Sequence, residues 1–138
     1  MRVMGIDYGD VRIGVALSDP LGITAQAFAV LDVRKTQDIL RELATIAAEH
    51  DVGRVVVGYP RNMNGTAGER ARRSEEFAET VRAATGLPVT LCDERLTTVS
   101  AQRALIAGRV RREKRRDVVD KIAAALILQT YLDSGGRP

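Results

Sequence analysis

The sequence predicts an α/β fold in which helices flank a mixed five-stranded sheet. Within the first 32 residues, three segments of β-type composition follow one another with only short turns between them, which is typical of an antiparallel meander. Further on, two short β-branched runs alternate with segments of helical periodicity, and a strand reached through a helix runs parallel to an earlier one. At 138 residues and without a long linker, the chain is expected to form one domain over residues 1–138.

Each strand of the predicted meander has its own signal. The first is the apolar run at residues 2–7, and the second, at 12–19, alternates Ile, Val and Leu with small residues, as a strand with two unlike faces does. The turn sequence DPLG then leads into the third strand at 23–32. Loops this short favour antiparallel pairing of all three strands.

Helices and strands alternate in the rest of the chain. Apolar periodicity and boundary residues predict helices at 36–50, 66–85, 97–108 and 117–133, and strands at 54–60 and 89–95. Thr66 and Glu69 match a capping box at the start of the second helix, and Gly86 is the expected residue at its C-terminal end. Asp117 is interpreted as the N-cap of the final helix, which is strongly apolar.

Composition excludes several classes of protein. No apolar run approaches the roughly 20 residues of a membrane helix, and the single cysteine, Cys92, forms neither an internal disulfide nor a zinc site. These features predict a cytoplasmic protein without membrane partners. The net charge is only +3, but the segment RVRREKRR at 109–116 carries +5 and the rest of the chain sums to −2. Such a basic segment is typical of contact with a nucleic-acid backbone, although many charge runs are simply solvated.

Carboxylates stand at the ends of three apolar elements. Asp7 ends the first strand, Glu94 follows the last strand and Asp120 lies in the first turn of the final helix. In the predicted topology these positions converge at one sheet edge, where a shared Mg²⁺ or Mn²⁺ would relieve their repulsion and support phosphodiester hydrolysis. Each also has a purely structural interpretation: Asp7 as a turn residue, Glu94 as a solvated strand end, and Asp120 as a partner of Asp117 or of the helix dipole.

Four segments together carry a resemblance to a known family. They are GIDYGDVRIGVALSD, VVVGYPRNMNGTAGERA, LCDERLTTVSA and VVDKIAAALILQTYLD, and they resemble the YqgF (RuvX) family of ribonuclease H-like nucleases in order and in spacing. The resemblance implies a ribonuclease H-like fold, a cytoplasmic location and metal binding by Asp7, Glu94 and Asp120. It also implies processing of the 5′ end of pre-16S ribosomal RNA. An older description of the family is Holliday junction resolvase, from its similarity to RuvC.

Basic residues near the predicted site are candidates for phosphate contact, although any single one could be an ordinary solvated side chain. They are Arg70, Arg73, Arg95, Arg109, Arg111, Arg112, Lys114, Arg115 and Arg116. Gly9 and Gly14 could leave room beside Asp7 for a substrate or metal, or could serve only turn and strand-crossing geometry.

Several functions remain compatible with this sequence. The leading hypothesis is a metal-dependent nuclease whose partner is structured RNA, namely pre-16S rRNA. A resolvase would act on branched DNA and would require a homodimer, whereas the RNA enzyme could be a monomer or a homodimer. A non-catalytic nucleic-acid-binding module would be expected to lack one of the three acids, and none is missing. An actin- or sugar-kinase-like ATPase needs two such domains, so a chain of 138 residues argues against it.

Overall fold

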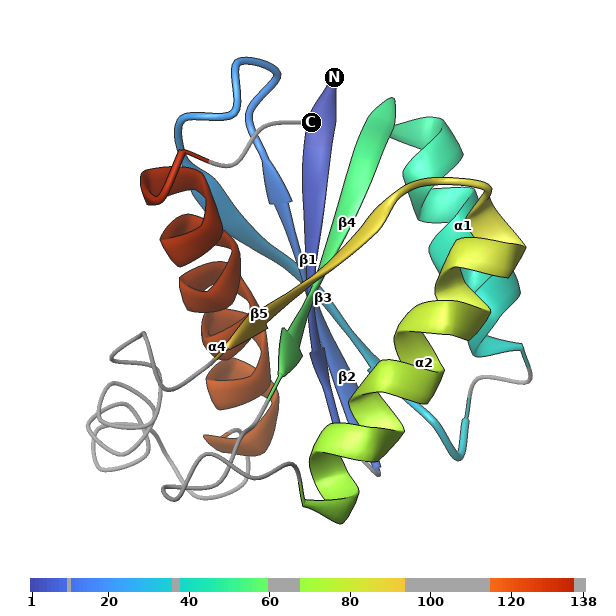
Figure 1. The fold of residues 1–138 in the computed structure, drawn as a ribbon. Coiled ribbons are helices and arrows are strands. Elements are labelled where there is room, and N and C mark those ends of the chain that lie inside the picture. The colour runs from blue at the N-terminus through green and yellow to red at the C-terminus, as the bar shows by residue number, and fades with distance from the viewer. Residues whose placement is uncertain (10, 36–37, 60–67, 94–114, 136–138) are drawn as a thin grey trace.

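The protein is a three-layer α/β structure built around one mixed sheet (Figure 1). A computed structural model describes residues 1–9, 11–35, 38–59, 68–93 and 115–135. The elements, in chain order, are β1 (Arg2–Tyr8), β2 (Arg12–Ser18), β3 (Ala25–Asp32), α1 (Ile39–Glu49), β4 (Val52–Tyr59), α2 (Glu69–Thr85), β5 (Val89–Asp93) and α4 (Arg115–Asp133). The predicted helix at 97–108 lies outside the described residues.

The sheet has the predicted topology. Its strand order is β3-β2-β1-β4-β5, in which β1, β2 and β3 pair antiparallel while β1, β4 and β5 run parallel. The carboxyl ends of the three parallel strands therefore lie at one edge of the sheet. The first turns of α2 and α4 lie at the same end of the molecule (Figure 1).

Two apolar clusters cover the two faces of the sheet. One cluster packs α1 and α2 against residues that include Met4, Ile6 and Val15, and the other packs α4 against residues that include Val3 and Ala16. The alternation of these residues along β1 and β2 reflects the two-residue period of a strand. Because β1 and β2 are buried on both faces, the core fixes which face each of their side chains takes.

The helix boundaries partly follow the sequence signals. Asp38 caps α1 by accepting a hydrogen bond from the backbone N–H of Arg41 at 3.0 Å. Gly86 ends α2 in the left-handed conformation, with φ 72°, as predicted. The predicted capping box at the start of α2 was wrong, because the N-cap is Gly68 and no side chain caps that helix end.

The prediction for Asp117 was also wrong. Helix α4 begins at Arg115, so Asp117 belongs to its first turn and is not its N-cap. Arg115 and Arg116, which were assigned to a basic segment preceding the helix, are its first residues. The physical reason is that arginine is a good helix former, so the charge run does not by itself end a helix. In the described part of the chain, none of the helices has the length and apolar character needed to cross a membrane.

Candidate active site

Asp7 points toward the α4 side of the sheet. It is the penultimate residue of β1 and pairs with Gly14 of β2, and paired residues of antiparallel strands direct their side chains to the same face. A β-carbon added to Gly14 would collide with the backbone carbonyl oxygen of Asp120, so this face is the one that α4 covers. Ile6 and Tyr8, the neighbours of Asp7, pack in the cluster on the opposite face.

Helix α4 lies unusually close to β1 and β2, and this closeness seats Asp120 near Asp7. A β-carbon at Gly5 would be 2.7 Å from Cβ of Leu128 and 3.0 Å from the carbonyl oxygen of Ala124. Glycine at positions 5 and 14 thus lets the helix backbone rest almost directly on the sheet. The structure therefore brings together two of the three predicted acids, on one face and at one end of the sheet.

The third predicted acid, Glu94, lies outside the described residues. Strand β5 ends at Asp93, immediately before it, and the strand register aligns Ile6, Val57 and Leu91 in one row across β1, β4 and β5. Asp7 is one residue beyond that row, so β1 and β5 end at the same edge, about 10 Å apart across two strand spacings. That the strands converge here is confirmed; that Glu94 joins the site stays a prediction.

The donor atoms of the site suit a hard divalent cation. Both Asp7 and Asp120 are half-buried, and carboxylates that share a site away from bulk water repel one another, which a bound cation relieves. Carboxylate oxygens are the ligands that Mg²⁺ and Mn²⁺ prefer. No group of three His, Cys, Asp or Glu residues suited to a metal occurs within the described ranges, which do not include Glu94.

The described basic residues belong to the N-terminal parts of two helices that begin near this edge. Arg73 is exposed on α2 and forms an ion pair with Glu69 at 3.4 Å, and Arg70 belongs to the same helix. Arg115 and Arg116 open α4, four to five residues before Asp120. The other predicted phosphate contacts, Arg95, Arg109, Arg111, Arg112 and Lys114, lie outside the described residues.

For Gly9 and Gly14, the structure favours a role in turn and packing geometry over a role in leaving room for substrate or metal. A β-carbon at Gly9 would lie 2.6 Å from the carbonyl oxygen of Arg12, so Gly9 serves the tight turn between β1 and β2. The space beside Gly14 holds the backbone of α4 rather than a gap for substrate. Sequence analysis did not single out Gly5, whose signal was present: a glycine inside an otherwise apolar strand often marks a close backbone approach.

Comparisons with known sequences agree with the geometry. Residues 1–134 match the model of the RuvX family, which is described as "Holliday junction resolvase". A relative from Pelotomaculum thermopropionicum, named "Putative pre-16S rRNA nuclease", is 50% identical and covers 100% of this chain and 90% of its own length. A relative of the same name from Geobacillus kaustophilus is 52% identical, over 97% of this chain and 99% of its own.

Solved structures share the fold at low sequence identity. RuvC from Thermus thermophilus in complex with a Holliday junction superposes with a TM-score of 0.59 at 17% identity, covering 98% of this chain and 96% of RuvC. The Holliday junction resolvase of fowlpox virus gives a TM-score of 0.54 at 14% identity, covering 97% and 99% of the two chains. These likenesses confirm the predicted fold, which this chain shares with RuvC.

Proposed function

This chain belongs to the RuvX family, and on that premise we propose that it is a metal-dependent nuclease that hydrolyses phosphodiester bonds in the precursor of 16S ribosomal RNA. The observation that carries the chemistry is the packing of Asp120 over Gly14, directly beside the position of Asp7. The relatives, about half identical over nearly the whole chain, support the choice of RNA as substrate.

In this proposal Asp7, Asp120 and Glu94 hold one or two Mg²⁺ or Mn²⁺ ions. Such ions lower the pKa of a bound water and stabilise the leaving oxygen of the phosphodiester. Asp7 and Asp120 come from two separate rigid elements, β1 and α4, and Glu94 directly follows β5 in the sequence. Close packing of α4 on Gly5 and Gly14 limits how far Asp120 can move from Asp7.

The basic residues would position the RNA by its phosphates. Arg70 and Arg73 on α2, Arg115 and Arg116 on α4, together with Arg95, Arg109, Arg111, Arg112 and Lys114, are the proposed contacts. Contacts of this kind are independent of sequence and weaken as salt rises. We further propose a cytoplasmic protein with one domain, acting as a monomer or a homodimer.

Resolution of four-way DNA junctions is the second candidate. The family description and the fold of RuvC favour it. A resolvase must cut two strands symmetrically, so it needs two sites related by a dimer axis.

The test compares two labelled substrates in Mg²⁺ or Mn²⁺: a 5′-extended 16S precursor RNA and a four-way DNA junction. Asp7→Asn and Asp120→Asn are the test variants, and Glu75→Gln, an exposed acid on α2, is the matched control. Metal-dependent RNA cleavage that both test variants lose and the control keeps is the expected result. Symmetric nicking of the junction alone would move the assignment to a resolvase. Binding of both substrates without any cleavage would contradict a catalytic function.

A further inference from the structure

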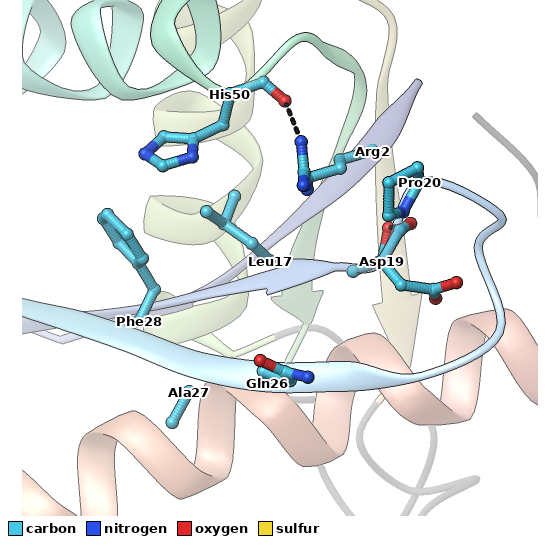
Figure 2. Close-up of a pocket in the computed structure, with 9 residues that line it drawn as sticks. Arg2, Leu17, Asp19, Pro20, Gln26, Ala27, Phe28 and His50 are labelled. Atoms are coloured by element: carbon cyan, nitrogen blue, oxygen red, sulfur yellow. Dashed lines mark hydrogen bonds between the residues drawn. The ribbon is translucent and has the colours of Figure 1, made fainter.

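A cavity lies away from the carboxylates, at the other end of the sheet and on its other face. It has a volume of about 320 Å³, which is near the lower end of small-molecule sites. Figure 2 shows its lining, with Leu17 between a pair of rings, Phe28 and His50, and the guanidinium of Arg2. Leu17 belongs to the cluster under α1 and α2, whereas Asp7 faces α4. Arg2 also begins the strand that Asp7 nearly ends, roughly 17 Å away.

Arg2 contributes a positive charge that no carboxylate among the described residues pairs with. Its side chain is half-buried, and one of its N–H groups donates to the carbonyl oxygen of His50 at 3.1 Å. Guanidinium carries five N–H donors, and the described residues supply neither a second acceptor nor an ion pair for them. A partly desolvated arginine in this state is suited to a phosphate or carboxylate, which it can bind through two parallel hydrogen bonds.

Phe28 contributes an aromatic surface held in a fixed direction. Strand β3 pairs Ala29 with Val15 and Ala27 with Ala16, so Phe28 is the extra residue of a β-bulge, a feature that re-aims a side chain. Its ring meets that of His50 edge to face, at 4.9 Å between centroids and 74° between planes. This arrangement leaves at least one face of Phe28 uncovered by His50, and 40% of the residue is exposed.

Asp19, an acidic residue of the cavity lining, already accepts hydrogen bonds through its carboxylate. Asp19 accepts hydrogen bonds from the backbone N–H groups of Thr24, Ile23 and Leu21, at 2.8, 2.7 and 3.1 Å. The bond from Thr24 is the leading reason that the pKa of Asp19 is lowered. In Figure 2 its carboxylate points away from Arg2, toward the loop that it orders. Asp19 thus fixes one wall of the cavity and leaves Arg2 available to an anion.

We propose that this cavity binds a nucleoside monophosphate, with its base against Phe28 and its phosphate on Arg2. Every base has a flat face that stacks on an aromatic ring, and Arg2 supplies the anion contact. Gln26, on β3, is exposed at the rim and offers both a donor and an acceptor to the base edge. The site is independent of the carboxylates, so it would remain if the proposed nuclease function were wrong.

The test is a titration of the isotope-labelled protein with AMP, followed by amide NMR in EDTA to exclude binding through metal. Saturable shifts are expected at Leu17, Phe28 and His50, and Asp7→Asn should bind AMP as the native protein does. Phe28→Ala should weaken AMP binding at least about fivefold, the lower range for losing one stacked base. Arg2→Gln should weaken AMP at least about tenfold and leave adenosine unchanged.

Two controls match these variants. Leu21→Ala removes an apolar side chain that is 79% exposed outside the cavity, and Arg41→Gln removes an exposed cation on α1; both should bind AMP normally. Circular dichroism would verify that every variant is folded. Shifts confined to the surroundings of Asp7 and Asp120, or no saturable shift, would overturn the proposal. So would equal affinity for inorganic phosphate and AMP with no effect of Phe28→Ala, since that describes an anion site only.

Discussion

Replacing Gly14 by alanine should push α4 away from the sheet. The added methyl group would occupy the position of the carbonyl oxygen of Asp120, which is backbone and cannot rotate aside. Forcing a methyl group into a packed interface costs about 1–3 kcal/mol. Alanine recovers about 0.4–1 kcal/mol by restricting the unfolded chain. We therefore expect a net loss of about 1–2 kcal/mol, which lowers Tm by about 3–7 °C for a chain of this size.

Gly53→Ala provides the matched control. Its β-carbon would also be crowded, at 2.6 Å from Sδ and 3.1 Å from Cβ of Met1, but these atoms belong to a flexible side chain on a residue that is 67% exposed. Its free energy of unfolding should change by no more than about 0.5 kcal/mol. Urea unfolding followed by circular dichroism measures both variants. Equal stability of Gly14→Ala and Gly53→Ala would refute the close packing of α4 on which the site geometry depends.

Three further predictions follow from the described contacts. Leu128→Ala truncates a fully buried side chain that packs against Gly5, and it should lower the free energy of unfolding measured in urea by about 2–5 kcal/mol. A loss below about 1 kcal/mol would mean that α4 is loosely packed. The folded pKa of Asp19 is lowered from 3.8, so its contribution to stability is present above that value and is lost as the pH falls through the folded pKa. The free energy of unfolding of the native protein should therefore fall more on acidification than that of Asp19→Ala. Parallel pH profiles of the two proteins would argue against the loop contacts. Arg115→Gln and Arg116→Gln should each reduce the slope of log affinity against log salt for RNA by about 1. Arg34→Gln is the control and should leave that slope unchanged, because Arg34 pairs at 3.4 Å with Asp32 at the end of β3.

Most of the fold could be predicted from the sequence because its signals are local. Alternation in β2, the helical period of α1 and the glycine at position 86 each specify one element without reference to the others. The two wrong predictions concerned the first residues of α2 and α4, where more than one sequence pattern could mark the start of the helix. A capping-box pattern at Thr66 occurs two residues before the true N-cap. Arg115 and Arg116 extend α4, although they were assigned to a basic segment before the helix.

The site was predictable only in outline. Topology placed Asp7 and Asp120 at one end of the sheet, since parallel strands end together and the final helix covers them. What fills the space beside Gly14 depends on the position of α4, which no local pattern specifies. The cavity at Phe28 was missed for a similar reason, because a β-bulge depends on the register between two strands and leaves no signature in either one.

The shared metal is tested most directly by Mn²⁺ titration, with free ion measured by electron paramagnetic resonance. If Asp7 and Asp120 ligate the same ion, Asp7→Asn and Asp120→Asn should each weaken Mn²⁺ binding by at least about tenfold, since each removes a charged ligand. The double variant should be little worse than either single one, because ligands of one ion act as a unit. Glu75→Gln should bind Mn²⁺ normally. Unchanged Mn²⁺ affinity in both single variants would show that these carboxylates do not form a metal site.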